Sequence, residues 1–430
     1  MSTSGRSYRD RNGHPIVVVT GMGVVTSLGA GLHDNWAALT AGRSGIHAIT
    51  RFPTDDLRTK IGGTVDFVTA EPFSAPELSE RLADLAIGEA VAQAAIGRKG
   101  DFPGPMFIAV PPVELEWPQR RALAAATSGG GEIDYPRLLA VAREKGTELH
   151  RRFLFGSVAE HLAETYGTKG MPVSLSTACA SGGTAIQLGL ETIRRGDADA
   201  VIAAGTDGSI HAEALIRFSL LSALSTQNDP PEAAAKPFSK NRDGFVMAEG
   251  AGALVLESLE HAVARGAEIL GVVEGCGEHA DSFHRTRSSP DGHAIIAAIR
   301  AALDDAGVSP DEVDHINAHG TGTPENDKME HMGLEAVFGE RTARMPVSSN
   351  KSMIGHTLTA AGAVEAVFSL TTMREGRIPP TINYEVPDPA IPLDVVPNVA
   401  RDAAVRRVMS NSFGFGGQNV CLIFAAEPAQ

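Results

Sequence analysis

Short apolar runs alternate along the chain with segments whose hydrophobic residues recur at helical spacing. The run IVVVTGMGVV at 16–25 predicts a buried strand that ends in a glycine turn, and ADAVIAAG at 198–205 predicts a strand of a parallel sheet covered on both faces. Hydrophobic positions at helical spacing predict amphipathic helices over 79–96 and 293–307. This alternation of strands and helices predicts an α/β fold.

The second part of the chain follows the same plan as the first. Strand-like runs at 313–318 and 347–350 each lead into a polar loop, and a helix is expected over 361–375. Two further strands, 405–410 and 420–424, bracket a glycine-rich turn as a hairpin. The order strand, loop, helix, strand therefore occurs twice, although no repeat by sequence identity is visible.

The region 106–170 interrupts the first half of the chain. An apolar strand, MFIAV, stops at Pro111-Pro112 and is followed by EWPQRR and by three glycines at 129–131. Helical segments are expected over 138–166, with their basic residues on a solvated face. Those residues are Arg143, Lys145, Arg151 and Arg152.

Size and charge narrow the classes of function. A chain of 430 residues exceeds the usual size of one core, so we expect two halves, 16–266 and 267–430. The 52 acidic residues outnumber the 37 basic ones, and a net charge of −15 argues against nucleic acid as a partner. No apolar run reaches the length of about 18 residues that predicts a membrane span. The polar segment 1–15 lacks a signal-peptide core, so we expect a cytoplasmic protein with a disordered leader.

The three cysteines give neither a disulfide framework nor a paired metal-ligand spacing. Cys276 and Cys421 sit in strand-like runs and are expected in the core. Cys179 follows a short apolar run and precedes residues at helical spacing, 185–195, which predicts a strand, a tight turn and a helix. Free N–H groups and the positive dipole at a helix start favour a thiolate, so Cys179 is a candidate nucleophile. The alternative is a small buried hydrophobic residue.

Three later motifs add weight to the nucleophile. His319 lies in NAHGTGTPENDKME, His356 lies in SNKSMIGHTLTAAGA, and a glycine-aromatic turn, NSFGFGGQN, follows near the C-terminus. Neither histidine has the i, i+4 spacing or the carboxylate-rich surroundings of a metal site, so no metal is expected. Two imidazoles are instead suited to form hydrogen bonds with a reacting carbonyl group.

These stretches, in the order Cys, His, Lys-x-x-x-x-His and Gly-Phe-Gly, resemble the elongating β-ketoacyl-acyl-carrier-protein synthases of the KAS II type in the thiolase-like superfamily. The resemblance runs from about residue 17 to residue 424. It implies a five-layer αβαβα thiolase-like fold made of two duplicated halves, and a homodimer. It also implies a decarboxylative Claisen condensation in fatty acid elongation, in which malonyl-acyl-carrier-protein extends an acyl group held on Cys179 and gives 3-oxoacyl-acyl-carrier-protein and CO2.

The resemblance assigns a role to each candidate residue. Cys179 takes the acyl group, and the backbone N–H groups of Cys179 and Phe415 form the oxyanion hole. His319 and His356 stabilise the enolate that remains when the malonyl carboxylate leaves. Lys351 orders the site through a carboxylate, for which Glu330 in NDKME is the expected partner. Phe415 also matches a gate that swings when the enzyme is acylated.

The resemblance further implies a binding path for the phosphopantetheine arm. Thr286, Thr321 and Thr323 match positions that hydrogen-bond this arm, although threonines in turns are more often local backbone caps. Because the arm arrives on an acyl carrier protein, no tightly bound cofactor is expected. The carrier protein is the expected partner.

Two regions depart from the family pattern. The segment VPPVELEW stands where the family carries a glycine-rich turn, in a neighbourhood that contributes to the acyl pocket and the dimer contact, so 106–170 is expected to form an inserted cap or dimer region. Phe218 matches a pocket phenylalanine, but Ser222 stands where many family members carry a basic carrier-docking residue. The substitutes that we consider for docking are Arg285, Arg287, Arg120 and Arg121.

Three alternatives remain open at this point. The product can be specialised, with very long chains or a polyketide in place of ordinary fatty acids. A non-decarboxylative thiolase needs a second cysteine near the C-terminus, where this chain carries the Phe-Gly turn. A non-catalytic partner subunit lacks the nucleophile, whereas Cys179, His319 and His356 are all present.

Overall fold

The computed structural model describes residues 7–70, 74–127 and 135–428. Ten of the strands in the described part form one continuous sheet, which divides where β1 and β8 pair at only two positions. The N-terminal sheet has the order β5-β4-β6-β7-β1 and the C-terminal sheet the order β10-β9-β13-β14-β8. The N-terminal strands are β1 (Val17–Thr26), β4 (Met106–Ala109), β5 (Val173–Leu175), β6 (Ala200–Asp207) and β7 (Gly250–Ser258). The C-terminal strands are β8 (Gly271–Ala280), β9 (His315–Asn317), β10 (Val347–Ser348), β13 (Arg407–Phe413) and β14 (Gln418–Ala425).

The two sheets repeat one pairing pattern. In the first, β1 runs antiparallel to β7 and β7 antiparallel to β6, whereas β6, β4 and β5 are parallel. In the second, β8, β14 and β13 are antiparallel neighbours, whereas β13, β9 and β10 are parallel. Each half is therefore a mixed sheet, and the strand expected at 198–205 has a parallel neighbour on one side only. The hairpin expected near the C-terminus is confirmed as β13 and β14.

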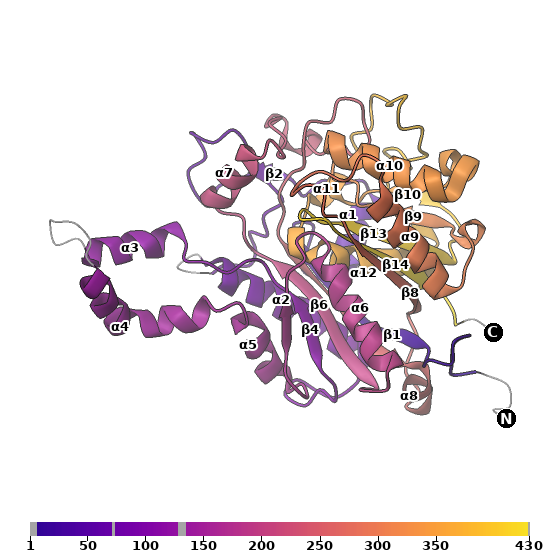
Figure 1. Cartoon of the computed structure of the whole chain (residues 1–430), viewed down its shortest axis with the longest axis horizontal. Coiled ribbons are helices and arrows are strands. Elements are labelled where there is room, and N and C mark those ends of the chain that lie inside the picture. The colour runs from indigo at the N-terminus through magenta and orange to yellow at the C-terminus, as the bar shows by residue number, and fades with distance from the viewer. Residues whose placement is uncertain (1–6, 71–73, 128–134, 429–430) are drawn as a thin grey trace.

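Helices occupy the space between the two sheets and cover their outer faces, which gives the five layers of the thiolase-like fold (Figure 1). The middle layer contains α6 (Ser181–Arg194) and α12 (Ala361–Glu375). The outer helices are α2 (Ala75–Ala94) and α5 (Ser157–Tyr166) on the N-terminal side, and α9 (His293–Ala306) and α10 (Pro324–Phe338) on the C-terminal side. Every residue of α12 from Ala361 to Met373 is buried, as a helix between two sheets must be.

The contact between α6 and α12 depends on glycine. A Cβ atom at Gly182 would lie 2.4 Å from the amide nitrogen of Ala363, and one at Gly362 would lie 2.4 Å from the amide nitrogen of Gly183. The first turns of both helices therefore touch backbone to backbone, which only glycine permits. This contact brings the segments before the two helices together at the centre of the molecule.

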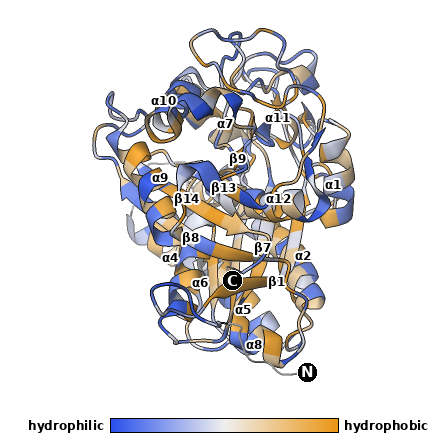
Figure 2. Cartoon of the chain, turned by 90° about the vertical axis from the view of Figure 1, so that its right-hand side faces the viewer, coloured by the Kyte–Doolittle hydropathy of each residue, from blue (hydrophilic) through white to orange (hydrophobic). Residues whose placement is uncertain are grey.

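The smaller elements lie mostly around the ends of the sheets. Hydrophobic residues are concentrated on the strands, as β1 and β14 show in Figure 2. The remaining helices are α1 (Leu32–Thr40), α7 (Ala212–Leu220), α8 (Leu259–Ala264) and α11 (Lys351–Ile354), with 3₁₀ turns η1 (Pro231–Ala233), η2 (Pro310–Glu312), η3 (Gly339–Arg344) and η4 (Leu358–Ala360). Two small hairpins pair β2 (His47–Ala48) with β3 (Ile61–Gly62), and β11 (Arg377–Ile378) with β12 (Arg401–Asp402).

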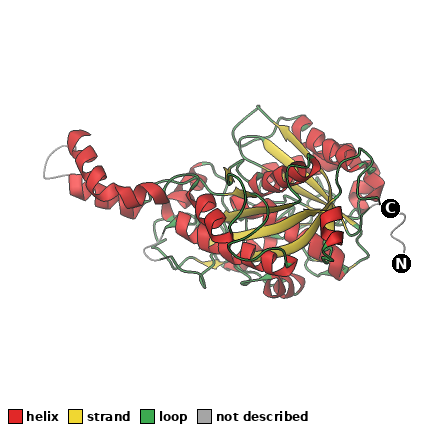
Figure 3. Cartoon of the chain, turned by 90° about the horizontal axis from the view of Figure 1, so that it is seen from below, coloured by secondary structure: helices red, strands yellow, loops and turns green. Residues whose placement is uncertain are grey.

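The inserted region projects from the body of the molecule (Figure 3). It consists of α3 (Trp117–Thr127) and α4 (Tyr135–Arg152), which pack against each other. No helix was predicted at α3. Pro118 lies in its first turn, where proline is tolerated because its missing N–H would have no partner in the helix. The glycines at 129–131 lie outside the described residues.

The leader expected to be disordered over 1–15 has a defined conformation from Ser7 onward, and residues 1–6 lie outside the described part. The amide of Ile16 donates to the carbonyl of Tyr8 at 3.0 Å, and Arg11 donates to the carbonyl of Asp304 at the end of α9. A cation at this position complements the negative end of the helix dipole, which explains the order. Among the described residues, no helix combines the length and the apolar character needed to cross a membrane.

Candidate active site

Cys179 lies in the tight turn between β5 and α6, as the sequence predicted. Ala178, which precedes it, has a φ of +50°, a left-handed conformation that costs energy for any residue other than glycine. The turn is held by Ser181, whose hydroxyl accepts from the amide of Thr177 at 2.7 Å and donates to the carbonyl of Ala178. The result is a nucleophile that is 8% exposed and fixed at the start of a middle-layer helix.

His319 follows β9 and is held through its backbone by Glu330. The Glu330 carboxylate accepts from the amides of His319 and Gly320 at 2.8 and 2.7 Å, and from the side chain of Asn411 at 3.2 Å. Glu330 comes from the buried face of α10 and is fully buried. It positions the His319 loop.

Lys351 pairs with a different carboxylate from the one expected. Its ammonium group contacts Glu365 on α12, and the two side chains are 2% and 1% exposed. The prediction that Lys351 pairs with Glu330 is therefore wrong. The sequence held a signal for the correct partner, because Glu365 is the single acidic residue in the otherwise uncharged stretch AGAVEAVFSLTTM, and a charge on a wholly buried helix needs a partner.

His356 is fixed by a short backbone ladder and by one hydrogen bond to its ring. Its amide donates to the carbonyl of Val246 at 2.7 Å, and its carbonyl accepts from the amide of Ala248 at 2.9 Å. The amide of Leu358 donates to Nδ1 of the ring at 3.2 Å. Because Nδ1 accepts, the neutral ring carries its proton on Nε2, which is buried and has no partner among the described residues.

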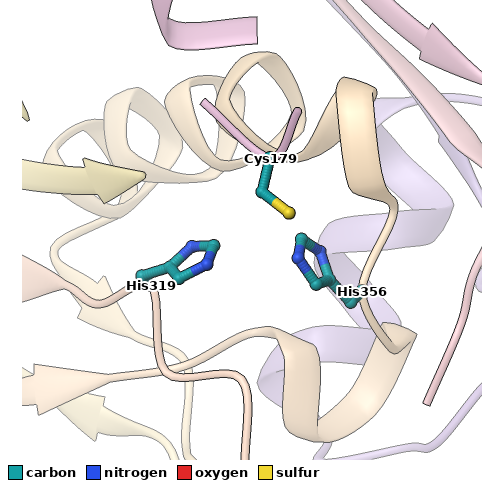
Figure 4. A group of neighbouring side chains, drawn as sticks. All are labelled: Cys179, His319 and His356. Atoms are coloured by element: carbon teal, nitrogen blue, oxygen red, sulfur yellow. The ribbon is translucent and has the colours of Figure 1, made fainter. Parts of the chain in front are cut away.

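The three reactive side chains converge in one place, although they come from opposite halves of the chain (Figure 4). The sulfur of Cys179 and one ring nitrogen from each histidine all lie within 4.8 Å of one another. The two imidazole rings meet edge to face, with centroids 5.3 Å apart. A sulfur and two nitrogens can also bind a metal, but a protonated Nε2 on His356 offers no lone pair, so hydrogen-bond donation fits this ring better.

Burial sets the protonation of the site. It raises the pKa of Cys179 to about 11, and the Phe415 amide and the charge of Lys351 only partly oppose that rise. Burial, with the charge of Lys351, lowers the pKa of both histidines well below 6.5. The thiolate expected from the helix start is therefore not the resting form, because desolvation outweighs the helix dipole. The site holds a neutral thiol and two neutral imidazoles.

The glycine-aromatic turn between β13 and β14 closes the site from the other side. The amide of Phe415 points at the sulfur of Cys179. A Cβ atom at Gly417 would lie 1.9 Å from the carbonyl oxygen of Asp281, so no other residue fits there. The ring of Phe415 packs against the hydrophobic cluster that also holds Phe218 and Phe245.

A cavity of about 480 Å³ joins these parts. Among the expected site residues, its lining includes Cys179, His319, His356, Phe415, Phe218, Thr286, Thr321 and Thr323. Lys351 and Glu330 are absent from this lining and lie buried behind it. Thr323 also caps α10 by accepting from the amide of Asn326 at 3.2 Å, so its local role exists beside any role in binding.

Basic residues at the cavity differ in part from those expected. Of the arginines considered for docking, Arg287 lines the cavity, as does Ser222, which stands where relatives carry a basic residue. His284 and Lys328 also line it, although neither was expected from the sequence. Arg285 holds the Phe-Gly turn, because its carbonyl accepts from the amide of Gly416 at 2.8 Å. Arg120 instead forms ion pairs with Glu114 and Glu213 at the base of α3.

Comparison with known proteins identifies the family. The profile for "Beta-ketoacyl synthase, N-terminal domain" matches residues 15–79 and 120–262, and that for "Beta-ketoacyl synthase, C-terminal domain" matches 270–385. The 3-oxoacyl-[acyl-carrier-protein] synthase 2 of Coxiella burnetii is 39% identical over 95% of this chain and 98% of that protein. The enzyme of the same name from a Synechocystis strain is 38% identical over 95% of this chain and 97% of its own length.

Solved structures agree. A chain of a type II polyketide synthase ketosynthase in complex with its acyl-carrier protein superposes with a TM-score of 0.84 at 32% identity, over 96% of this chain and all of that one. A β-ketoacyl synthase from Burkholderia phymatum gives a TM-score of 0.79 at 33% identity, with the same coverage of both chains. The chain belongs to the β-ketoacyl synthase family of thiolase-like condensing enzymes.

Proposed function

We propose that the chain condenses malonyl-acyl-carrier-protein with an acyl group held on Cys179, and that it releases 3-oxoacyl-acyl-carrier-protein and CO2. The observation that carries this proposal is the convergence of one sulfur and two neutral imidazoles within 4.8 Å in a cavity closed by the Phe415 amide. The curated relatives named as 3-oxoacyl-[acyl-carrier-protein] synthases support the reaction class.

In the first half-reaction, the sulfur of Cys179 attacks the carbonyl carbon of an acyl thioester. A carbon–sulfur bond forms to the enzyme, the bond to the phosphopantetheine sulfur breaks, and the thiol proton leaves on the released phosphopantetheine thiol. The amides of Cys179 and Phe415 hold the oxyanion, a contribution worth about 10²–10³ in rate per donor. The resting thiol must lose its proton as it attacks, because burial keeps its pKa at about 11.

In the second half-reaction, the malonyl group loses CO2 and the electron pair of the broken carbon–carbon bond forms an enolate. The Nε2–H of His356 is free to donate to the enolate oxygen, and His319 faces the same space. The enolate carbon then attacks the acyl-Cys179 carbonyl, a carbon–carbon bond forms, and the cysteine sulfur leaves and regains a proton. Neutral donors suit this step, because they stabilise a developing negative charge without being consumed.

We propose further that no cofactor is resident, since phosphopantetheine arrives on the carrier protein past Thr286, Thr321 and Thr323. The solved complex of a related ketosynthase with its acyl-carrier protein supports such a partner. A homodimer and a cytoplasmic location also belong to the proposal. Light scattering after size exclusion checks the dimer, and a monomer at micromolar concentration contradicts it.

A thiolase needs a second reactive cysteine near the C-terminus, and Cys421 does not fill that role. Cys421 is fully buried in β14 and is absent from the cavity lining given for the described residues. The polyketide alternative keeps some support, because the ketosynthase that superposes with a TM-score of 0.84 belongs to a polyketide synthase. Mass spectrometry of products formed from acyl carriers of graded length separates fatty acid elongation from this alternative.

The decisive experiment separates the two half-reactions. A Cys179→Gln variant should still release CO2 from malonyl-acyl-carrier-protein but should form no 3-oxoacyl product, because the amide fills the place of an acylated cysteine. Iodoacetamide should label Cys179 ahead of Cys276 and Cys421. Among these three cysteines, only Cys179 lines the cavity. Loss of both half-reactions in Cys179→Gln, or equal labelling of the three cysteines, contradicts the proposal.

A further inference from the structure

A buried aspartate lies beside the site and takes no part in the mechanism given above. Asp207 ends β6 and is 1% exposed. Its Oδ1 accepts from the amide of Ser209 at 3.0 Å and from the Ser209 hydroxyl. Its Oδ2 accepts from the amide of Thr359 at 3.2 Å and from the Thr359 hydroxyl at 2.7 Å. Each carboxylate oxygen therefore meets two donors.

This arrangement holds a charge without a counter-ion. Among the described residues, no lysine, arginine or histidine forms an ion pair with Asp207. Burial raises the pKa of Asp207 to about 6, and the hydrogen bonds from Ser209 and Thr359 oppose the rise. Thr359 belongs to η4, which leads directly into α12, and a carboxylate at the start of a helix is favoured by the free N–H groups and by the dipole.

Asp207 connects the two halves of the molecule at one point. β6 belongs to the N-terminal half, whereas Thr359 belongs to the C-terminal half. Gly205, two residues earlier on the same face of β6, allows close approach, because a Cβ atom there would lie 3.1 Å from the carbonyl oxygen of Thr359. The Thr359 hydroxyl also lies 2.7 Å from the carbonyl oxygen of Thr206, so its single proton is shared between this carbonyl and Oδ2 of Asp207. The Thr359 amide is the second contact of this residue with the end of β6.

Thr359 directly follows Leu358, the residue whose amide determines which ring nitrogen of His356 carries the proton. The amide of Leu358 donates to Nδ1 of His356, and Leu358 has a φ of +48°, a conformation that an isolated turn rarely adopts. The hydrogen bonds between Thr359 and Asp207 fix the orientation of the peptide group that joins Leu358 to Thr359. A shift of this turn would release the Leu358 amide from the ring and allow the proton to move to Nδ1.

We infer that Asp207 is a positioning residue for His356, which through Thr359 holds the turn that keeps the imidazole proton on Nε2. The inference rests on the proposed function, since it gives the Nε2–H of His356 a role in malonyl decarboxylation. It assigns Asp207 no contact with substrate. It also predicts that the two half-reactions respond differently to a change at Asp207.

The substitution Asp207→Asn tests this difference, because it keeps the shape and removes the charge. The new NH2 group must face the amide of either Ser209 or Thr359. That amide loses its acceptor and opposes a second N–H donor, whereas the hydroxyl beside it can turn its proton away and accept. The charge of Asp207 raises the pKa of Cys179, so its removal should make the thiol easier to ionise. Positioning and electrostatics thus predict opposite changes.

For Asp207→Asn we expect kcat for malonyl decarboxylation to fall at least tenfold with KM little changed, while iodoacetamide alkylates Cys179 at the same rate or faster. An unchanged decarboxylation rate overturns the inference, and so does a parallel fall in decarboxylation and alkylation, which would make Asp207 a purely structural residue. Wild-type protein in the same assays tests the proposed function separately: if it does not decarboxylate, that function fails whatever the variant does.

A second pair of variants covers the case in which Asp207→Asn does not fold. Thr359→Ser keeps the hydroxyl and should retain decarboxylation, whereas Thr359→Val loses it and should reproduce the selective fall. Thr371→Val is the matched control, because Thr371 is buried on α12 and its hydroxyl bonds only within the helix, to the carbonyl of Val367 at 2.7 Å. Equal rates for Thr359→Ser and Thr359→Val overturn the inference.

Discussion

The start of α6 and the start of α12 are equivalent places in two halves with the same strand pairing. In each half a parallel strand, β5 or β10, leads into a reactive segment and then into a middle-layer helix. The N-terminal segment supplies Cys179, and the C-terminal segment supplies His356. The two helix starts touch at Gly182 and Gly362, so the duplicated plan brings unlike chemical groups face to face.

The two groups differ in how burial affects them. Burial raises the pKa of the thiol to about 11 and lowers the pKa of the imidazole well below 6.5. One physical cause thus keeps both groups neutral, since a cavity that excludes water penalises any charge. The resting site therefore holds a thiol beside a neutral imidazole, and both of these groups are uncharged before a substrate binds.

The largest expected effect comes from removing Cys179, the reactive residue at the start of α6. Cys179→Ala should lower the rate of condensation by about 10⁴ or more, the scale seen when a catalytic nucleophile is deleted. Radiolabelled acyl transfer from a carrier protein measures it. Cys276→Ala is the control, because Cys276 lies on β8 outside the cavity lining, and comparable losses in the two variants would contradict the assignment.

The next largest effect concerns the buried ion pair between Lys351 and Glu365, which lies behind the cavity that His356 lines. Lys351→Met leaves the Glu365 carboxylate buried without a counter-charge, so we expect the free energy of unfolding to fall by about 3–5 kcal/mol. Chemical denaturation measures this loss. The double variant Lys351→Met with Glu365→Leu should recover much of it, whereas Lys351→Met with Glu330→Gln should not. Recovery with the Glu330 substitution instead would restore the pairing that the structure rejects.

Removing His356, the reactive residue before α12, should have a somewhat smaller effect on the rate of malonyl decarboxylation. His356→Ala deletes one donor to the enolate, which should slow malonyl decarboxylation by about 10²–10³. Release of CO2 in the Cys179→Gln background isolates this step from acyl transfer. Acylation of Cys179 by an acyl carrier in the single variant should be less affected, and an equal loss in both steps would remove the division of labour between the two helix starts.

A smaller effect is expected where the two helices touch. Gly182→Ala places a methyl group against the backbone of α12, so overpacking should cost about 1–3 kcal/mol of stability. Thermal unfolding measures this change. Gly156→Ala is the control, because Gly156 has an ordinary φ of −81° and an added Cβ would meet only Oε1 of Glu160, at 3.9 Å. An equal stability change at both sites would show that the contact between the helices is loose.

The smallest effect is expected on acidification. The proposed mechanism uses neutral imidazoles. Because the pKa of both histidines lies well below 6.5, lowering the pH toward 6 should protonate neither ring. Decarboxylation by Cys179→Gln should therefore change by less than about twofold between about pH 8 and pH 7. This interval lies above the pKa of about 6 of Asp207, whose charge positions the His356 turn. A steep fall centred near 6.5, the ordinary value for an exposed histidine, would show that the cavity is wetter than its burial indicates.

Much of the site could be predicted from the sequence because its motifs are local. The turn with Cys179, the loops with His319 and His356 and the hairpin with Phe415 each carry their own glycines and small residues, and all four line one cavity. Glu365 was missed because its partner lies 14 residues away on another helix. Its isolation in an apolar stretch indicates that it needs a partner but does not say which residue that is. The helix α3 was missed because a proline that starts a helix and one that breaks it look the same in sequence.

The order of the elements, the family and the residues that can react follow from the sequence, because they depend on periodicity and on short motifs. Two contacts could be learned only from the folded chain: Lys351 pairs with Glu365 and not with Glu330, and Asp207 holds Thr359 in the turn after His356. The tertiary structure also decided that the resting nucleophile is a thiol. Desolvation and long-range contacts set all three, and both come into existence only when the two halves close around the middle helices.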